Sequence, residues 1–413
     1  MAALPSVARS ILCSLALFIV LATGAACGTP PPVAGLNASS SLTNADIASQ
    51  ERFLAAWHLS PYNPDRDGYP HSASFSRYFE AVGFLDLPDS ILIGEISSLE
   101  VAPASSNLLV VDHHSSAVHV LDAQDRKWRR LEAESCHPGF VFRPFNAAFD
   151  GAGRIVTGSN AAASGFLFTD AGECDGAIDI GFGPPNDLSG NKNGAVVYRA
   201  GRDSYTVAQI AYADGTTQTF FEDDSFVALN SRFRLVHHLA RTVDGRFAFV
   251  QPQSSKVRLL SPSDSSVVEI GSAPNYYRPI EKDISSAYLD TEDFFDELRE
   301  IREGKSFTSA VYSLGDSILA VFYTNGYETF ERSEKSMGLQ LIDLNGATLN
   351  DEPILMRGYR SGFVGAAHGL LFRVAAEYEN DFEDSNAPIA VCRLRREPLG
   401  ATADSLGSKR FSG

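Results

Sequence analysis

The stretch from 98 to 131 reads Ser98-Leu-Glu-Val-Ala102, Asn107-Leu-Leu-Val-Val-Asp112, Ala117-Val-His-Val-Leu-Asp122 and Trp128-Arg-Arg-Leu131. These are four short apolar segments, separated by turn residues, with the alternation that is typical of antiparallel strands. Together they predict one four-stranded meander. Related units follow downstream, starting near Asn146, Ala195, Val236, Ser306 and Gly362.

Six such units, each about forty residues long, predict an all-β protein, a six-bladed β-propeller of four-stranded antiparallel blades. Because the third and fifth units are irregular, five or seven blades remain open. The segment 79–87 reads as a strand with no hairpin partner beside it. We expect it to pair within the last blade, because joining the two chain ends closes the ring and removes an exposed edge.

The N-terminus predicts export. Residues 1–26 contain Arg9 and an apolar run from Ile11 to Leu21, which is too short for a membrane span but fits a signal peptide. Gly24-Ala-Ala-Cys27 is similar to a bacterial lipobox, apart from the glycine in place of leucine. It predicts lipidation of Cys27 and a membrane anchor, on the outer membrane or a periplasmic face. Ordinary cleavage after Ala26 and an uncleaved anchor are the alternatives.

The rest of the chain divides into three parts. Residues 27–70 are rich in small residues, Pro and Ser and predict a flexible tether, within which 48–60 can form a helix with Phe53, Leu54 and Trp57 on one side. We interpret this helix as a cap on the propeller. Residues 71–397 form the predicted propeller, and 398–413 a disordered tail.

The composition is acidic, with 34 Lys and Arg against 51 Asp and Glu and a formal net charge of −17. This charge makes nucleic acid and anionic membrane surfaces poor partners. Solubility explains it most simply, and a cationic ligand or divalent ion is the alternative. We expect a monomer.

Three cysteines fall within the predicted propeller. Cys136 lies in the connection leaving the first blade, whereas Cys174 follows the outer hairpin turn of the second. These positions are predicted to lie near opposite faces of the ring, which disfavours a disulfide despite the oxidising compartment. Cys392 lies in a strand pattern and is expected to be a small buried apolar residue.

The sequence contains no identifiable catalytic motif. There is no Gly-x-Ser-x-Gly elbow. Gly304-Lys-Ser306 ends like a phosphate loop but lacks the earlier glycine. The pairs His113-His114 and His237-His238 suggest metal ligands at first, but neighbours on a strand point to opposite faces. We therefore predict turn or packing roles for them.

One segment departs from the repeat. Residues 290–303 predict an inserted helix, capped by Asp290 and ended by Gly304. Its apolar stripe can either cover a blade edge or form the wall of a pocket at one mouth of the channel. The stripe consists of Phe294, Leu298 and Ile301.

The run Ile91-Leu-Ile-Gly-Glu-Ile-Ser-Ser-Leu-Glu-Val101, the strands that follow it, the acidic helix and the lipobox together resemble the bacterial six-bladed β-propeller lipoproteins, relatives of NHL and TolB-like propellers. The resemblance covers roughly residues 73 to 396. It implies the same fold and location, and no particular activity.

Two function classes stay open. The first is a binding module without a cofactor, whose ligand is a protein, a glycan or a small molecule. The second is a metal-dependent hydrolase similar to the sugar-lactone lactonases, which hold a divalent ion such as Ca²⁺ on the propeller axis. That similarity implies Glu95 and Asn146 as ligands. His237, which stands where the family has an Asn-Gly pair, is the third candidate. The similarity breaks down where the lactonase pattern has Asp, because this chain has Gln251 or Pro252.

Overall fold

The structure is a computed structural model, and all residues it describes belong to one compact unit, Ser39–Gly413. Within this unit it describes residues 44–57, 59–60, 73–85, 87, 96–132, 136, 142, 144–159, 164–179, 187–200, 205–223, 238–275, 277–280, 296, 304–315, 317–325, 336–350, 354–357, 362–374 and 389–396. In these ranges no helix is both long and apolar enough to cross a bilayer.

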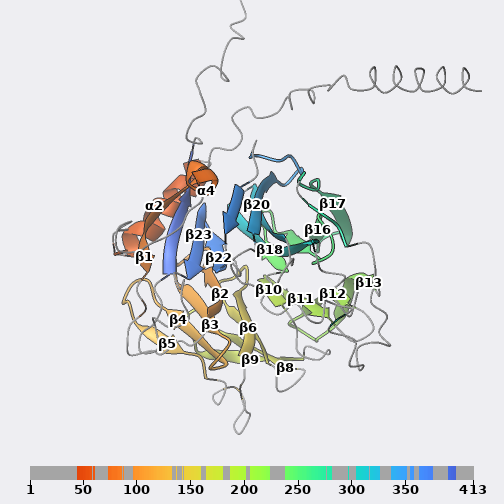
Figure 1. The fold of residues 1–413 in the computed structure, drawn as a ribbon. Coiled ribbons are helices and arrows are strands. Elements are labelled where there is room, and N and C mark those ends of the chain that lie inside the picture. Colours follow the sequence, from red (N-terminus) through yellow and green to blue (C-terminus); the bar gives the residue numbers. More distant parts are fainter. Residues whose placement is uncertain are drawn as a thin grey trace, which may run out of the picture. The chain divides into compact units, whose positions relative to one another are not determined.

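The strands form six antiparallel sheets of four strands each, arranged as the blades of a ring (Figure 1). The six-bladed propeller is thereby confirmed, and counts of five and seven are excluded. Blade 1 consists of β2 (Ile96–Val101), β3 (Leu108–Asp112), β4 (Ala117–Leu121) and β5 (Trp128–Arg130). Blade 2 consists of β6 (Pro144–Phe149), β7 (Ile155–Ser159), β8 (Ser164–Phe168) and β9 (Cys174–Asp179). Blade 3 consists of β10 (Asp187–Asn191), β11 (Gly194–Ala200), β12 (Tyr205–Ala211) and β13 (Thr217–Asp223).

Blades 4 to 6 repeat this order. Blade 4 consists of β14 (Leu239–Arg241), β15 (Phe247–Val250), β16 (Val257–Ser261) and β17 (Ser266–Ile270). Blade 5 consists of β18 (Ser306–Gly315), β19 (Ile318–Asn325), β20 (Ser336–Asp343) and β21 (Ile354–Arg357). Blade 6 consists of β22 (Phe363–Ala367), β23 (Leu370–Val374), β24 (Ile389–Leu394) and β1 (Phe79–Leu85).

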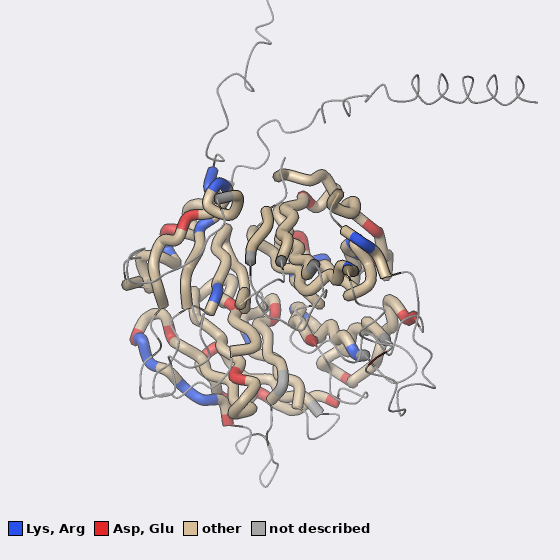
Figure 2. The backbone as a smooth tube through the Cα atoms, in the orientation of Figure 1, with Lys and Arg blue, Asp and Glu red and all other residues tan. Residues whose placement is uncertain are grey.

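The first strands of the blades are the innermost ones. Each contacts the first strands of both neighbouring blades: β2 contacts β6 and β22, β10 contacts β6 and β14, and β18 contacts β14 and β22. These six strands therefore surround the axis. The core lies between adjacent blades, where buried apolar side chains of the middle strands face one another. Charged residues gather mainly at turns and strand ends (Figure 2).

The last blade is closed by both ends of the domain, as predicted. β1 pairs with β24 from Phe79↔Leu394 to Leu85↔Ile389. Arg395 strengthens the junction, because its Nη1 lies 3.0 Å from Oε2 of Glu80. The short helix α4 (Ala73–Tyr78) leads into β1, and the ring of Phe75 stacks on that of Phe79 with centroids 4.8 Å apart.

The ring closes tightly where blade 6 meets blade 1. Gly365 of β22 lies directly against the carbonyl oxygen of Leu99 in β2, so a Cβ at this position would overlap that oxygen. Glycine is required here for space and not for conformation. Tyr312 of β18 braces the other side of blade 6, since its hydroxyl donates to the carbonyl oxygen of Phe363 at 2.8 Å.

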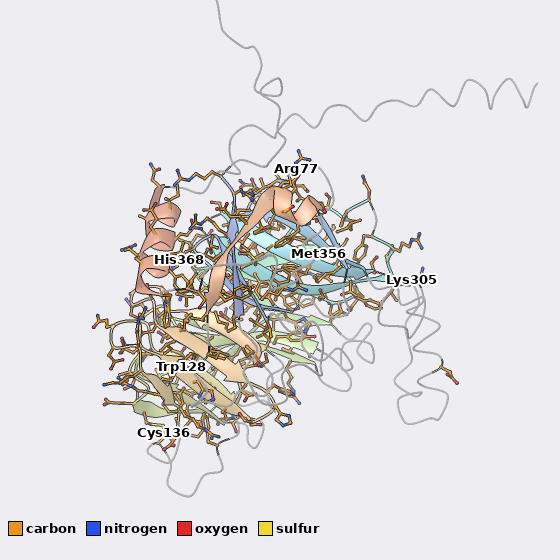
Figure 3. All side chains as sticks on the ribbon, turned by 60° about the vertical axis from the view of Figure 1, so that its left-hand side comes forward. Arg77, Trp128, Cys136, Lys305, Met356 and His368 are labelled. Atoms are coloured by element: carbon orange, nitrogen blue, oxygen red, sulfur yellow. A yellow bond between two sulfur atoms is a disulfide. The ribbon has the colours of Figure 1, made fainter. Side chains whose placement is uncertain are left out.

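Helix α2 (Asn44–Ala56) covers the junction of blades 6 and 1, and it begins and ends four residues earlier than the predicted helix 48–60, so Trp57 follows its end. Phe53 is fully buried and meets the ring of Phe372 edge-on, with centroids 5.6 Å apart. Trp57 donates through Nε1 to the carbonyl oxygen of Ser106 at 3.1 Å. Gln50 donates to the carbonyl oxygen of His368, which lies close to α2 in Figure 3.

Aspartates shape many of the hairpin turns. Asp112 accepts hydrogen bonds from the backbone N–H of His114 and from Ser115, in the turn between β3 and β4. Asp343 likewise accepts from the N–H groups of Asn345 and Ala347. These are Asx-type turns, in which a carboxylate satisfies backbone donors. Part of the acidic composition therefore serves the turns. His113 and His114 lie in such a turn, as predicted.

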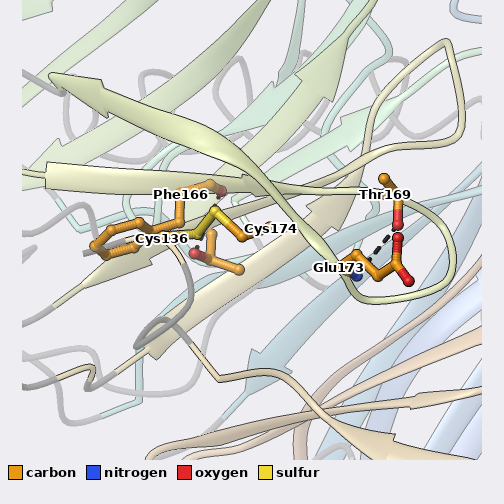
Figure 4. The surroundings of a disulfide bond; sticks show 6 residues. Cys136, Phe166, Thr169, Glu173 and Cys174 are labelled. Carbon is orange, nitrogen blue, oxygen red and sulfur yellow. Dashed lines mark hydrogen bonds between the residues drawn. A yellow bond between two sulfur atoms is a disulfide. The ribbon is translucent and has the colours of Figure 1, made fainter. Parts of the chain in front are cut away.

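The prediction against a disulfide was wrong. Cys136 and Cys174 are bonded, with Cα atoms 5.4 Å apart (Figure 4). The expected separation of faces assumed a full-length outer strand, but β5 ends at Arg130 after only three residues. Both cysteines pack on the core between blades 1 and 2, next to Phe142. Cys392 is free and buried, as expected.

Candidate functional site

The polar side chains on the innermost strands are the natural candidates for function, because these strands surround the axis. Two carboxylates stand out there. Glu100 lies on β2 of blade 1, and Asp187 begins β10 of blade 3. Each is held by the backbone of the following blade.

Glu100 bridges blades 1 and 2. Its Oε2 accepts a hydrogen bond from the backbone N–H of Phe149 at 2.9 Å. Burial among protein atoms raises the pKa of Glu100 to about 7, and the charge of Asp187 acts in the same direction. The Phe149 N–H and the Arg241 guanidinium oppose this shift without cancelling it. Glu100 therefore titrates near neutral pH.

Asp187 bridges blades 3 and 4 in the same manner. Its Oδ2 accepts from the backbone N–H groups of His238 at 2.7 Å and Leu239 at 2.9 Å. Oδ1 accepts from the N–H of Leu188 at 2.9 Å. Burial raises the pKa of Asp187 to about 7, although all three hydrogen bonds favour the charged form. The two carboxylates can each take up a proton near pH 7, and one oxygen of each links its blade to the next.

Aromatic and imidazole groups complete this part of the wall. The His238 ring lies against the Tyr198 ring, with centroids 4.1 Å apart, and its Nδ1 is 3.2 Å from the carbonyl oxygen of Val250. His238 is buried, so it has the packing role predicted for one member of its pair. Burial raises the pKa of Tyr198 well above its ordinary value, and the charge of Asp187 adds to the effect. Tyr198 is thus a neutral phenol at physiological pH.

Of the three candidate metal ligands, the structure places one. Asn146 lies on the innermost strand β6, where it pairs with Gly158 of β7. Glu95 and His237 lie outside the described residues. Within the described ranges, no group of three or more His, Cys, Asp or Glu side chains is arranged to hold a metal ion. The metal site stays a prediction.

The other predicted site residues also fall largely outside the described ranges. Cys27 and the three residues of the proposed pocket wall, Phe294, Leu298 and Ile301, are among them. Asp296 is described and is helical. Gly304 has a φ of 63°, the left-handed conformation expected where a helix ends. Ser306 begins β18, and its Oγ accepts from the N–H of Arg278 at 2.9 Å.

Comparison with known proteins supports the fold. No protein-family model matches the chain, and no curated protein matches its sequence. Among solved structures, a member of the DUF4221 family from Bacteroides vulgatus has a TM-score of 0.53 at 9% identity, covering 77% of this chain and 99% of that one. A Bacteroides fragilis protein described as a "Putative exported protein" also has a TM-score of 0.53, at 13% identity, covering 79% of this chain and 98% of that one. At these identities the likeness shows a shared propeller fold.

Proposed function

We propose that this chain is an extracytoplasmic, lipid-anchored propeller that acts as a binding module. In this proposal residues 1–26 are a signal peptide, Cys27 carries the lipid, and the connections at the mouths of the ring hold a protein, a glycan or a small molecule. The domain acts as a monomer.

The observation that carries the proposal is the bracing of the innermost strands. One carboxylate oxygen of Glu100, one of Asp187 and the hydroxyl of Tyr312 are each hydrogen-bonded to the backbone of the next blade. Side chains committed in this way stabilise a rigid ring, which suits a scaffold that presents loops to a ligand. Reactive groups would instead need acceptors and donors free to meet a substrate.

Two further observations support the location. The Cys136–Cys174 disulfide is typical of proteins that fold in an oxidising compartment, which lies outside the cytoplasm in bacteria. The Bacteroides fragilis protein with the same fold carries an export description. The lipid anchor itself rests on the lipobox-like sequence around Cys27.

The anchor is tested by expressing the full chain and a Cys27→Ser variant in a bacterial host with a fatty-acid probe. The wild type should carry the probe and sediment with membranes, whereas C27S should carry no probe and appear in the soluble extracytoplasmic fraction. Equal labelling of both proteins would contradict lipidation at Cys27.

The absence of metal-dependent hydrolysis is tested separately. Purified protein, dialysed against Ca²⁺-containing buffer without chelator, should hold no stoichiometric divalent ion by elemental analysis and should not open sugar lactones. One tightly held ion per chain, together with lactone hydrolysis that EDTA abolishes, would replace the binding module with the hydrolase.

A further inference from the structure

Arg241 ends the innermost strand β14 of blade 4, and its side chain reaches to blade 2. Its Nη2 lies 2.7 Å, and its Cζ 3.4 Å, from the point where a Cβ on Gly151 would stand. The guanidinium therefore packs against Gly151, where any larger side chain would collide with it. Arg241 forms no hydrogen bond and no ion pair with any described residue. Glu100 interacts with Arg241 electrostatically but forms no hydrogen bond with it. A half-buried guanidinium whose N–H groups lack acceptors is costly, so an added acceptor group would stabilise it.

Further hydrogen-bond donors lie around the same point. The backbone N of Lys192, in the turn between β10 and β11, is 3.3 Å from the same Cβ position on Gly151. The Tyr212 hydroxyl is buried and has no hydrogen-bond partner in the described part of the chain. The Arg154 guanidinium lies over the Tyr212 ring, 5.0 Å from its centroid. Blades 2, 3 and 4 thus each contribute to one cluster.

Two carboxylates lie near this cluster, and neither forms a hydrogen bond with Arg241. Glu100 interacts electrostatically with Arg241, but its hydrogen bond comes from the N–H of Phe149. Asp150 is fully buried, and its Oδ1 accepts from the N–H groups of Ala152 and Arg154. Its Oδ2 accepts from Nε of Arg154 at 2.9 Å. Asp150 is therefore committed to its own turn and to Arg154. The cluster is left with more donors than acceptors.

The charges that act on the Tyr212 phenol are consistent with its position near Arg154 and Arg241. Burial, and then the Asp150 carboxylate, raise the pKa of Tyr212 well above its ordinary value, while Arg154 and Arg241 act to lower it. The hydroxyl is thus within electrostatic reach of both guanidiniums and stays protonated, as a donor, at physiological pH.

We propose that Arg241, the Lys192 N–H and the Tyr212 hydroxyl form a binding site for a small anionic group, a carboxylate or a phosphate, where the turns of blades 2, 3 and 4 meet. A guanidinium offers two parallel N–H groups that match two oxygens of either anion. The N–H and the hydroxyl supply donors from blade 3. The site goes beyond the binding function proposed above, since it holds whether or not the chain is anchored to a membrane.

The overall charge of −17 does not argue against the site. Screening limits the reach of exposed charges to about 8 Å at physiological salt, so the immediate neighbours decide. Those neighbours are two guanidiniums, one of them already paired with Asp150, and Glu100, whose pKa of about 7 leaves it only partly ionised at neutral pH.

The site is tested by NMR on the full chain labelled with ¹⁵N-arginine, which reports the Nε–Hε signal of each guanidinium. The Arg241 signal is assigned by its loss in Arg241→Gln. Inorganic phosphate and acetate are titrated separately at constant ionic strength. We expect one of them to shift the Arg241 signal saturably, and the anion that binds at least tenfold tighter identifies the chemical class.

Variants complete the test through other arginine signals, with Arg154 as the reporter. Arg241→Gln should weaken binding at least tenfold and Tyr212→Phe about threefold. Arg246→Gln, which removes a partly exposed guanidinium paired with Asp244 in the turn that follows Arg241, should leave affinity within twofold. Should R241Q fail to fold, Y212F and the wild-type titration decide. The proposal is overturned if neither anion saturates the Arg241 signal, or if R246Q weakens binding as much as Y212F.

Discussion

The carboxylate of Glu100 in blade 1 and the backbone N–H of Phe149 in blade 2 form a hydrogen bond of 2.9 Å that links two neighbouring blades beside the axis. Because burial raises the pKa of Glu100 from 4.5 to about 7, this link couples the stability of the ring to pH.

The sign of that coupling follows from the raised pKa of the folded state. Below about pH 4.5 the carboxyl is protonated both folded and unfolded, and its contribution is fully present. As the pH rises to about 7, the unfolded chain ionises first and the free energy of unfolding falls, by on the order of 3 kcal/mol. Above pH 7 the loss levels off.

Glu100→Gln should remove this dependence, because the amide oxygen can still accept from Phe149 and no longer ionises. We expect E100Q to be more stable than the wild type at pH 8 and to lose less stability between pH 4.5 and 7, as measured by urea unfolding. Glu222→Gln, on the exposed outer strand β13, serves as the control. Identical pH profiles for E100Q and the wild type would contradict the shift.

Gly365 should tolerate no side chain. Gly365→Ala places a Cβ on the carbonyl oxygen of Leu99, and both belong to innermost strands that cannot separate without opening the ring. We expect a loss of about 3 kcal/mol or more in urea unfolding. Gly83→Ala is the matched comparison, since its Cβ would lie 2.6 Å from the carbonyl oxygen of Ser60. That neighbour is an isolated bridge, and about 1 kcal/mol is expected. A larger loss of unfolding free energy for G83A than for G365A would show that the contact of Gly83 with Ser60 is tighter than that of Gly365 with Leu99.

The Cys136–Cys174 disulfide should stabilise the domain considerably. It closes a loop with a sequence separation of 38, for which chain entropy gives about 3–4 kcal/mol. Reduction with dithiothreitol should lower the unfolding midpoint of the wild type, and Cys136→Ser should show the lowered midpoint without further response to reductant. If C136S still responds to dithiothreitol, the sensitivity arises from another part of the chain.

The docking of α2 depends on Phe53. Phe53→Ala removes a fully buried ring from its contact with Phe372 and should cost about 3 kcal/mol, enough to release the helix while the blades stay folded. Hydrogen exchange should then accelerate in 44–57 and remain slow in β23. Arg52→Ala, on the exposed side of the same helix, is the control and should leave exchange unchanged. Uniform acceleration across all blades would mean that α2 folds as part of the ring.

The sequence predicted the ring because the blade strands alternate strongly, and it predicted closure because 79–87 had no local partner. It missed β10, which reads Asp187-Leu-Ser-Gly-Asn191 and has no apolar alternation. This segment becomes a strand because of its contacts with neighbouring strands. Gly190 packs so closely on Asp150 that a Cβ added to Gly190 would lie 2.8 Å from the Cα of Asp150. Asp187 was missed with it.

The disulfide and the Arg241 cluster were hidden for a related reason. The length of β5 decides where Cys136 lies, and three residues is shorter than any other strand of blade 1. Arg241 follows an ordinary strand pattern, and its meeting with Gly151 and Lys192 depends on the angle between blades. Such contacts form between different repeat units, and the sequence pattern of a single unit does not predict them. Glu100, a single acid within Leu-Glu-Val, was not singled out from the sequence either.

The pairing of β1 with β24 joins residues such as Glu80 and Arg395, which are 315 positions apart. A chain emerging from its N-terminus can assemble blades 1 to 5 as they arrive, but β1 must wait for the final segment before it has a partner. Only a full-length domain can therefore close the ring. A product truncated before residue 389 would lack β24 and leave the edges of β1 and β23 unpaired, and quality-control proteases could distinguish it from the finished domain.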